Sequence, residues 1–232
     1  MQAVILAAGR GTRMKNLTSN IPKPLLTVAG KTLLEHKLDA LPESVDEVII
    51  IVGYLGGVIQ KHIGGIHGNK RILYIEQQVL NGTGGALWLA KPLLKGSFLV
   101  MYADDIYAKD DIEKASCFPW SIVGLEVDDI GSAAKIVIDG SDRVTNILEV
   151  GVHDNSPGFL NTGLYCLDTR LFDYPLVPKE PNSPEYGLPQ TIIQTGLELH
   201  LIKATFWLQI TDSEDLKKAA KILAKKARHH KR

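Results

Sequence analysis

Short apolar segments alternate with helix-like segments through the first half of this chain, and this alternation limits the fold more than any other feature. The pattern starts with a continuous apolar segment, Ala3 to Ala8, which is typical of a strand buried on both faces of a parallel sheet. Alternation at this spacing predicts an α/β fold with a Rossmann-like, doubly wound sheet, mixed but mostly parallel, with helices on both faces. Ligands of such sheets bind outside the carboxyl ends of the strands.

The expected elements follow this rhythm along the sequence. In the first half, strands are expected at 3–8, 47–52, 71–75 and 98–102, and helices at 32–41, 56–63, 84–94 and 110–115. The second half is richer in strand-like segments, at 121–126, 133–138, 144–149, 160–167 and, after a proline-rich loop at 177–186, 199–206. A terminal helix is expected with Ser213 as its N-cap, because acidic residues follow in the first turn and lysines gather toward the end.

Composition excludes several classes of function. The 232 residues, 45% of them hydrophobic, suffice for one substantial core, so a single domain is expected. Acidic and basic residues are equal in number, 26 each, which argues against a nucleic-acid or membrane-surface partner; no apolar stretch approaches the roughly 18 residues of a membrane span. With no signal peptide recognisable, a cytoplasmic location is expected, and a homo-oligomer is left open. Cys117 and Cys166 are interpreted as buried apolar residues.

A glycine-rich, doubly basic loop follows the first expected strand. Gly9 and Gly11 let the backbone bring its N–H groups close to a polyanion, and Arg10 and Arg13 add planar, permanently charged groups that suit a leaving pyrophosphate. The dinucleotide-binding fingerprint is excluded because Met14 stands at the third glycine, and no Walker A sequence follows. The loop therefore predicts a triphosphate site of another kind.

Two further groups of residues carry chemistry. Lys23 stands between Pro22 and Pro24, which predicts a stiff extended segment that projects one cation. Asp104 and Asp105 come directly after an expected strand, at the edge of the sheet where ligands bind. Carboxylates placed there are natural Mg²⁺ ligands, since this ion is usually held by one or two carboxylates together with substrate phosphates. The alternative is that the acidic pair only starts a turn.

The segment from Leu6 to Leu26, with Val28, Gly30 and Lys31 after it, resembles the signature LAAGxGTRMxPLTxxxPKPLLxVxGKPL of the sugar-phosphate nucleotidylyltransferases. Asn16 and Thr32 stand where that signature has proline. The resemblance implies the nucleotide-diphospho-sugar transferase type of fold as one domain. Its nucleotide-binding half would span about 1–116 and its acceptor-binding half about 117–212, followed by a C-terminal helix and basic tail at 213–232.

The same resemblance implies roles for individual residues. The implied catalytic residues are Arg13 and Lys23; those for the nucleotide are Leu6, Ala8, Gly9, Gly11, Thr12, Gln77, Gly82 and Thr83; those for the acceptor are Asp104, Glu149 and Asn161; and those for Mg²⁺ are Asp104 and Gln209. Gln77 would read the edge of a pyrimidine base with its amide, which both donates and accepts, and Gln78 is the fallback reader. Gly82 would leave room for the base.

Two departures from the family pattern affect the acceptor and the metal. Glu149-Val150-Gly151 stands where the family commonly has Glu-Lys-Pro, so a lysine expected near the acceptor phosphate is missing, and Lys135 is a candidate replacement. Gln209 falls where the family has the second carboxylate that binds the metal. Because an amide oxygen carries no formal charge, Mg²⁺ is expected to be bound more weakly unless Asp212 takes this role.

Three functions remain in competition. The first joins an NTP, expected to be a pyrimidine NTP, and a sugar-1-phosphate into an NDP-sugar and pyrophosphate. The second uses a phosphorylated alcohol such as phosphocholine or inositol phosphate as the acceptor of a cytidylyl group. The third is a nucleotide or sugar-nucleotide sensor without turnover.

Overall fold

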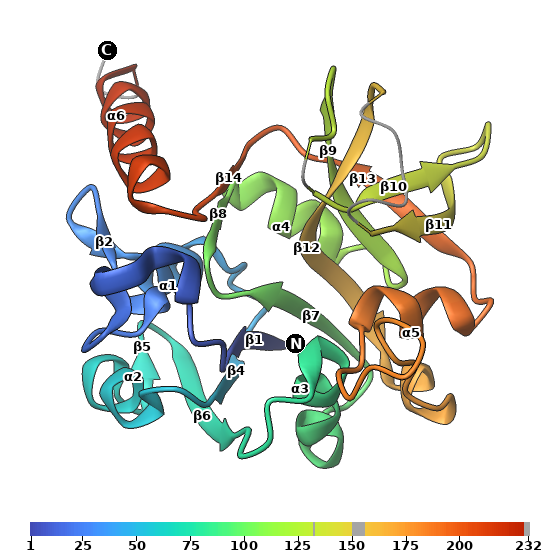
Figure 1. Cartoon of the computed structure of the whole chain (residues 1–232), viewed down its shortest axis with the longest axis horizontal. Coiled ribbons are helices and arrows are strands. Elements are labelled where there is room, and N and C mark those ends of the chain that lie inside the picture. The colour runs from blue at the N-terminus through green and yellow to red at the C-terminus, as the bar shows by residue number, and fades with distance from the viewer. Residues whose placement is uncertain (132, 150–155, 230–232) are drawn as a thin grey trace.

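The computed structural model describes residues 1–131, 133–149 and 156–229. One ten-stranded sheet runs through them (Figure 1). Its strands are β1 (Gln2–Ala7), β4 (Glu47–Val52), β5 (Ile66–His67), β6 (Lys70–Glu76), β7 (Ser97–Tyr102), β9 (Ser121–Val127), β10 (Lys135–Ile138), β11 (Arg143–Leu148), β12 (Gly158–Asp168) and β13 (Leu199–Lys203). Two small sheets pair β2 (Thr27–Val28) with β3 (Lys31–Thr32) and β8 (Asp105–Tyr107) with β14 (Trp207–Gln209).

The helices lie between these strands in the chain. The α-helices are α1 (Leu33–Ala40), α2 (Gly56–Ile63), α3 (Gly82–Ala90), α4 (Lys109–Ser116), α5 (Leu188–Gln194) and α6 (Ser213–His229). Short 3₁₀ helices are η1 (Thr12–Thr18), η2 (Lys23–Leu25), η3 (Lys91–Leu93) and η4 (Thr169–Asp173). Local chemistry explains the start of α1, where Thr32 and Glu35 form a reciprocal capping box.

The sheet has the strand order β10-β11-β13-β9-β12-β7-β1-β4-β6-β5. The strands β7, β1, β4 and β6 are parallel neighbours, and β9 and β13 are parallel too; the remaining neighbours are antiparallel. The expectation of a mixed sheet is therefore confirmed, whereas a mostly parallel sheet is found only in the first half. The second half differs because its strands β10 and β11 follow each other through a short turn, which permits only antiparallel pairing.

Helices cover both faces of the sheet, as expected. On one face, Ile5 of β1 and Ile50 of β4 share a buried cluster with residues of α1, α2 and α4. On the other face, Val4 of β1 shares a second cluster with residues of α3 and α5. Since successive residues of a strand point to opposite faces, the uninterrupted apolar strands β1 and β4 serve both clusters at once.

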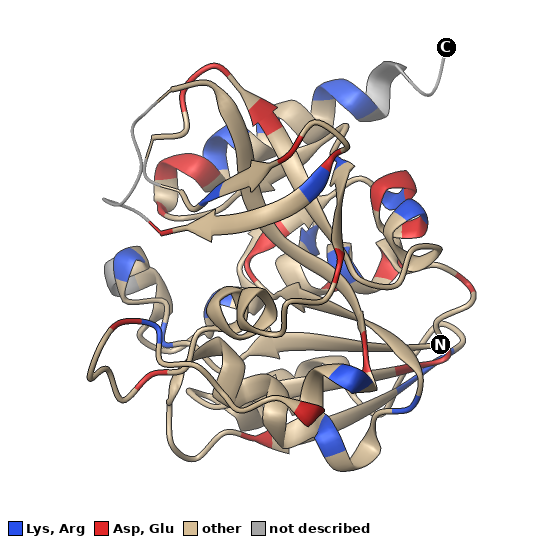
Figure 2. Cartoon of the chain, turned by 90° about the vertical axis from the view of Figure 1, so that its right-hand side faces the viewer, with Lys and Arg blue, Asp and Glu red and all other residues tan. Residues whose placement is uncertain are grey.

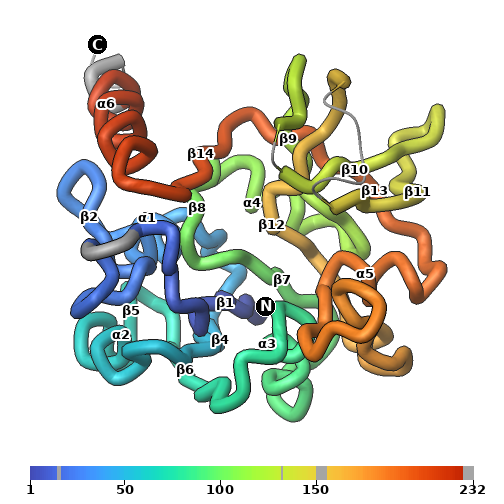
Figure 3. Tube along the Cα trace, in the orientation of Figure 1, coloured from blue at the N-terminus to red at the C-terminus, as the bar shows by residue number. Residues whose placement is uncertain are grey.

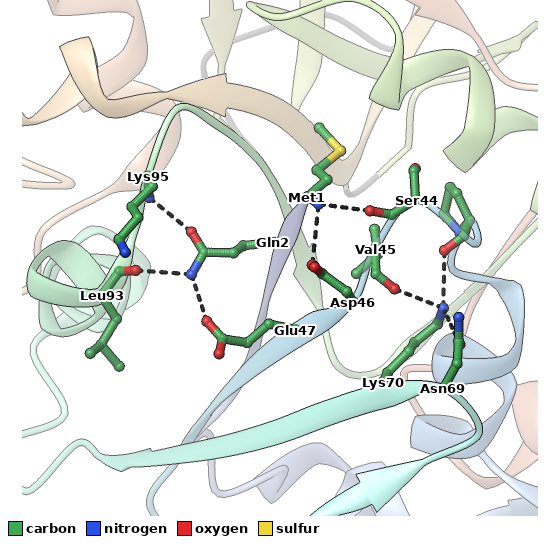
Figure 4. A network of polar contacts seen from close by, with 11 residues as sticks. Met1, Gln2, Ser44, Val45, Asp46, Glu47, Asn69, Lys70, Leu93 and Lys95 are labelled. Atoms are coloured by element: carbon green, nitrogen blue, oxygen red, sulfur yellow. Dashed lines mark hydrogen bonds and ion pairs between the residues drawn. The ribbon is translucent and has the colours of Figure 1, made fainter.

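Polar contacts fix the amino end of β1 (Figure 4). The amide nitrogen of Gln2 donates to Glu47 Oε1 at 2.7 Å and to the carbonyl of Leu93 at 2.9 Å, while its amide oxygen accepts from the backbone N–H of Lys95. Nearby, Lys70 Nζ donates to the carbonyl of Val45 at 3.0 Å. These contacts hold the register of β1 against β4, and with it the position of the loop at the other end of β1.

A third apolar cluster lies under α6, which extends from one side of the molecule in the trace of Figure 3. It joins Met14 of η1 to Ile106 of β8 and to Ile210 and Ala219 near the end of the chain. This cluster, called the α6 cluster below, ties the loop after β1 to the last helix.

The start of α6 corrects one expectation. The side chain of Asp212, rather than that of Ser213, accepts from the backbone N–H groups of Glu214, at 2.8 Å, and Asp215, at 3.1 Å. Asp215 in turn accepts from the backbone N–H of Thr211 at 2.8 Å. A carboxylate is the stronger acceptor for the positive end of a helix, so Asp212 takes the capping position and Ser213 becomes the first helical residue.

The distribution of charge and the character of the helices bear on the expected partners of the protein. Acidic and basic residues are interspersed over the ribbon and do not separate into two halves (Figure 2). Of the helices that the structure describes, none combines the length and the apolar character needed to cross a membrane.

Cys166 is buried, and burial raises the pKa of its thiol to about 12, but Cys117 is exposed, because it lies just past the end of α4. The interpretation of Cys117 as a buried residue was therefore wrong.

Candidate active site

A cavity of about 470 Å³ opens at the carboxyl ends of β1 and β7. Along the chain, β4 and β6 follow β1 on one side of it, whereas β7 lies on the other side, so the two connections leave a crevice between β1 and β7. The cavity is lined by Leu6, Ala7, Ala8, Gly9, Arg10, Gly11, Thr12, Arg13, Lys23, Pro24, Gln77, Leu80, Gly82, Thr83, Ala86, Tyr102, Ala103, Asp104, Glu185 and Thr211. Every residue expected to bind the nucleotide is in this lining, together with Arg13, Lys23 and Asp104.

The loop after β1 forms one wall of the cavity. Gly11 has φ +62°, and its carbonyl accepts from the backbone N–H of Met14 at 2.9 Å, which starts η1. A Cβ at Gly11 would lie 3.0 Å from Cβ of Lys23, so glycine lets these two segments approach. Arg10 and Arg13 are exposed, and neither forms an ion pair with another described residue. Their guanidinium groups are therefore available to an anion in the cavity.

Lys23 differs from the expectation in its backbone. Pro22 is extended, but Lys23 begins the 3₁₀ helix η2, because Pro24 in the first turn of a helix has a suitable φ and needs no N–H partner. Lys23 is buried, and its Nζ donates to Oδ2 of Asp104 at 2.5 Å. The lysine and the expected metal ligand therefore form an ion pair in the cavity wall.

Asp104 fits the requirements of a magnesium ligand. It lies in the turn between β7 and β8, and its side chain is 35% exposed, so one carboxylate faces the cavity beside the arginine-bearing loop. A single carboxylate together with phosphate oxygens is a common way to hold Mg²⁺ in proteins. Among the described residues, no three His, Cys, Asp or Glu side chains group into a metal site, so the nucleotide would have to supply further ligands.

Asp105 and Lys37 form a buried pair behind Asp104. Lys37 Nζ donates to the backbone carbonyl of Asp105 at 2.7 Å and lies 4.3 Å from the ring centroid of Tyr107. Burial lowers the pKa of Lys37 to about 8. Burial, with the charge of Asp104 beside it, raises the pKa of Asp105 well above its usual range. This pair supports β8 from below and does not line the cavity.

Gln209 lies next to this region but outside the cavity lining. It is exposed on β14 and directly opposite Asp105 in the pairing of β14 with β8. Thr211, two residues further on, does line the cavity. Asp212 caps α6, so its carboxylate is already engaged. The expectation that Gln209 contributes to the metal site stays a prediction.

Gln77 is held in a defined orientation at the end of β6. It is buried, and its Nε2 donates to Oδ1 of Asn81 at 2.9 Å and to the carbonyl of Gly82 at 3.2 Å. Gln78 is exposed and does not line the cavity, so the geometry favours Gln77 of the two candidate readers. Gly82 has φ +89°, and a Cβ there would overlap the carbonyl oxygen of Tyr186, so only glycine fits.

Two tyrosines connect the cavity with the residues expected to bind the acceptor. Tyr102 lines the cavity, and its hydroxyl contacts Thr83 and Tyr165; burial raises the pKa of Tyr102 to about 12. The hydroxyl of Tyr165 contacts both ends of the Asn161 amide, at 2.8 Å and 3.1 Å. Gly163 makes room for the ring of Tyr102, since a Cβ there would overlap that ring. Asn161 does not line the cavity, but it is held in place by Tyr165, which in turn contacts Tyr102 of the lining.

Glu149 and Lys135 lie farther along the second half of the sheet. Glu149 is half-buried after β11, and its Oε1 accepts from Gln190 Nε2 of α5 at 2.8 Å. Lys135 Nζ donates to Ser156 Oγ at 2.5 Å. Neither residue lines the cavity, so their acceptor-binding roles stay predictions, and Val150, where the family's lysine is missing, lies outside the described residues.

Sequence reasoning missed several lining residues. Arg10 was recognised only as part of the loop, and Tyr102, Glu185 and Thr211 were not singled out. Gly82 was expected to leave room for a base, but the backbone of Tyr186 lies against Gly82 and Gly84, and its carbonyl accepts from Gly84 N at 2.9 Å. This contact brings Glu185 of the proline-rich loop to the cavity.

Comparisons with known proteins identify relatives of this chain. A similar curated protein is the bifunctional protein GlmU of Methanococcus aeolicus, 35% identical over 75% of this chain and 41% of its own length. Another is the bifunctional IPC transferase and DIPP synthase of Thermococcus kodakarensis, 26% identical over 97% of this chain and 51% of its own length. The chain thus spans about half the length, or less, of these relatives.

Solved structures extend the comparison over the whole length. HddC from Yersinia pseudotuberculosis has a TM-score of 0.75 and 26% identity, covering 96% of this chain and 99% of its own. It has also been solved in complex with GMP-PN, with a TM-score of 0.73 to this chain. The family model described as nucleotidyl transferase matches residues 2–226. On this match, which covers nearly every residue described above, the chain belongs to the nucleotidyl transferase family.

Proposed function

We propose that this protein is a sugar-1-phosphate nucleotidylyltransferase, which joins an NTP and a sugar-1-phosphate into an NDP-sugar and releases pyrophosphate. The observation that carries the proposal is that one cavity collects two exposed arginines, the ion pair of Lys23 with Asp104, and the oriented amide of Gln77. Membership of the nucleotidyl transferase family supports it, as does the similarity to HddC, which has been solved in complex with GMP-PN.

In this reaction an oxygen of the acceptor phosphate attacks the α-phosphorus of the NTP. The bond from the α-phosphorus to the bridging oxygen breaks, and pyrophosphate leaves with the electron pair. The attacking phosphate is already an anion near neutral pH, so the protein needs no general base. Positioning and compensation of charge supply the catalysis. Arg13, with the backbone amides of residues 9–12, would bind the departing phosphates, and Lys23 would neutralise charge on the acceptor phosphate.

Asp104 is the residue that would hold Mg²⁺. The ion, when bound, neutralises charge on the triphosphate oxygens. The protein's part is to keep one carboxylate at the cavity edge, on a turn held by the pairing of β8 with β14. Gln209 would lie near this edge as a neutral and weaker ligand.

We also propose a division of labour within one domain. Residues from 1 to about 116 supply most of the cavity lining, which supports their role as the nucleotide-binding half. Asn161 and Glu149, reached through Tyr102 and Gln190, would bind acceptor hydroxyls in the half at about 117–212. Glu185 and Thr211 of that second half also line the cavity, so both halves would contact the nucleotide.

The test is Mg²⁺-dependent release of pyrophosphate across a panel of NTPs and acceptor phosphates. Sugar-1-phosphates are expected to support release; activity only with phosphocholine or inositol phosphate would favour the phosphorylated-alcohol alternative. Silence with every pair despite tight binding of an NTP would favour a sensor. Arg13→Ala and Asp104→Ala should each lower turnover by orders of magnitude and leave the fold intact. Near-normal turnover in both variants would contradict the proposal.

A further inference from the structure

The nitrogen of the Gln77 amide has no hydrogen left for a ligand. Its two hydrogens are donated to Oδ1 of Asn81 and to the backbone carbonyl of Gly82. Because a backbone carbonyl can only accept, the contact with Gly82 fixes which end of the amide is the nitrogen. Gln77 is 6% exposed, so this arrangement is locked by its surroundings. The group that remains for a nucleobase is the amide oxygen, an acceptor.

A second acceptor reaches the cavity from the proline-rich loop. Glu185 lines the cavity and precedes Tyr186, whose backbone N–H donates to the carbonyl of Asn81 at 2.8 Å. Asn81 is the residue that holds Gln77, so the segment that carries Glu185 is attached beside Gln77. In the described part of the chain, no lysine or arginine forms an ion pair with Glu185. Its carboxylate is therefore an acceptor without a bound cation.

The loop that carries Glu185 is closed by its own hydrogen bonds. The N–H of Gly187 donates to the carbonyl of Val177 at 3.0 Å, and the N–H of Lys179 donates to the carbonyl of Glu185 at 2.8 Å. The N–H of Glu185 itself donates to Ser183 Oγ at 3.1 Å. The backbone of Glu185 is thus fixed on both sides, and its exposed side chain extends from a fixed segment at the cavity.

We propose that Glu185 is a specificity-determining residue, and that the site selects a nucleobase with an exocyclic amino group over uracil or thymine. This inference rests on the proposed function, which places an NTP in the cavity. An amino group, as in cytosine, guanine or adenine, supplies N–H donors to Gln77 Oε1 and to the Glu185 carboxylate. Uracil and thymine have one N–H between two carbonyl oxygens. A second protein acceptor would therefore face a carbonyl, and two acceptors repel each other and form no hydrogen bond.

The inference narrows which pyrimidine base the site is expected to bind. A Gln77 amide free at both ends would suit uracil, thymine and cytosine alike, but with its nitrogen engaged it no longer offers a donor to a keto oxygen. Among pyrimidines, cytosine is the base that satisfies both acceptors. Among purines, guanine offers the most N–H groups on one edge.

Equilibrium binding of nucleotides without an acceptor tests the inference, because no turnover then occurs. Two pairs of probes isolate the amino group: CTP against UTP, and GTP against ITP, which lacks the 2-amino group. The wild-type protein with Mg²⁺ should bind the amino-bearing member of at least one pair roughly tenfold or more tightly. Equal affinities within both pairs, or tighter binding of UTP and ITP, would overturn the inference. If neither these four nucleotides nor ATP binds, the proposed function fails as well, so the two failures are distinguishable.

Two variants assign the selectivity to its source. Glu185→Gln replaces the carboxylate by an amide that can also donate, so the ratio of affinities within the discriminating pair should fall several-fold. The matched control is Glu180→Gln, which removes an exposed carboxylate of the same loop that does not line the cavity and should keep the ratio. Asn81→Ala frees one hydrogen of Gln77 Nε2 and should improve binding of UTP relative to CTP. An unchanged ratio in both Glu185→Gln and Asn81→Ala would contradict the assignment.

Discussion

Lys23 Nζ lies 2.5 Å from Asp104 Oδ2, so the cation expected on the acceptor phosphate and the carboxylate expected on the metal are bonded to each other. Lys23 is buried, whereas the Asp104 side chain is 35% exposed, and a ligand can therefore approach the pair from the carboxylate side. Binding of a metal would have to compete with the lysine for this carboxylate.

The first prediction concerns that competition. Lys23→Met should tighten binding of Mn²⁺, used as a probe for Mg²⁺, to the nucleotide-free protein by roughly two- to fivefold, since an ion pair whose carboxylate is open to solvent is worth little more. Isothermal titration calorimetry or the Mn²⁺ EPR signal gives the affinity without any turnover. Lys31→Met is the matched control, because it removes the Lys31 and Asp39 ion pair on the surface. Unchanged or weaker Mn²⁺ binding in Lys23→Met would refute the competition.

The second prediction concerns the pH dependence of stability. The pKa of Lys37 is about 8 in the folded protein, below its ordinary value of 10.5, so between these values the unfolded chain binds more protons than the folded one. The free energy of unfolding should therefore gain a contribution that increases with pH above 8, and below pH 8 the full penalty of the buried charge remains. In Lys37→Met this contribution should be absent.

Urea unfolding at a series of pH values from 7.5 to 9.5 measures this, a range chosen to stay below the ordinary tyrosine pKa of about 10. Lys61→Met, which removes an exposed lysine of α2, should retain the wild-type slope. If the free energy of unfolding depends on pH in the same way in wild type and Lys37→Met, then burial does not lower the pKa of Lys37 as described.

The third prediction concerns Gly82. Gly82→Ala should lower the free energy of unfolding by at least about 2 kcal/mol or displace the loop around Tyr186, because φ is +89° and the new Cβ would overlap the Tyr186 carbonyl. The thermal unfolding temperature should fall, and nucleotide binding should weaken. Gly57→Ala on α2, where a Cβ meets nothing within 4 Å, should be neutral or slightly stabilising. Equal behaviour of the two variants would contradict the close approach.

The fourth prediction concerns the positioning of Asn161. Tyr165→Phe removes the hydroxyl that contacts the Asn161 amide, so KM for the acceptor should rise roughly fivefold or more while KM for the NTP stays near the wild-type value. A loss of folding alone would lower the apparent kcat by reducing the active fraction and would leave both KM values unchanged. The control is Tyr74→Phe, which removes a hydroxyl bonded to the carbonyl of Gly64 away from the cavity. A selective rise in KM for the NTP would show that Tyr165 serves the other substrate.

The sequence predicted local elements better than the contacts between them. The bounds expected for β4 and α2, 47–52 and 56–63, agree with the structure, because continuous apolar residues and glycine at a helix start are local signals. The strands β8 and β14 were not expected. Each has three residues, and their pairing joins Tyr107 to Trp207, a relationship that no local pattern contains.

In the candidate site, too, local features were easier to predict than contacts between distant segments. The glycine and arginine loop, Lys23 and Asp104 could be found from the sequence because residue type and spacing reveal charge and turn chemistry, and Gln77 was found through the family resemblance. Glu185 could not, since a loop rich in proline and acidic residues is typical of an exposed connection. Only the non-local pairing of Tyr186 with Asn81 gives Glu185 its place. For the same reason the contact of Lys23 with Asp104, 81 residues apart, was not foreseen.

The α6 cluster has a consequence for biosynthesis. Met14, in the loop that would bind the triphosphate, packs with Ile210 and Ala219, which are translated some two hundred residues later. On the ribosome, the parallel strands β1, β4, β6 and β7 can pair before Ile210 and Ala219 emerge, but that loop gains these packing partners only afterwards. A chain truncated before Ile210 would thus contain these parallel strands but would lack the packing partners of Met14, so the loop proposed to bind the triphosphate would be supported only in part.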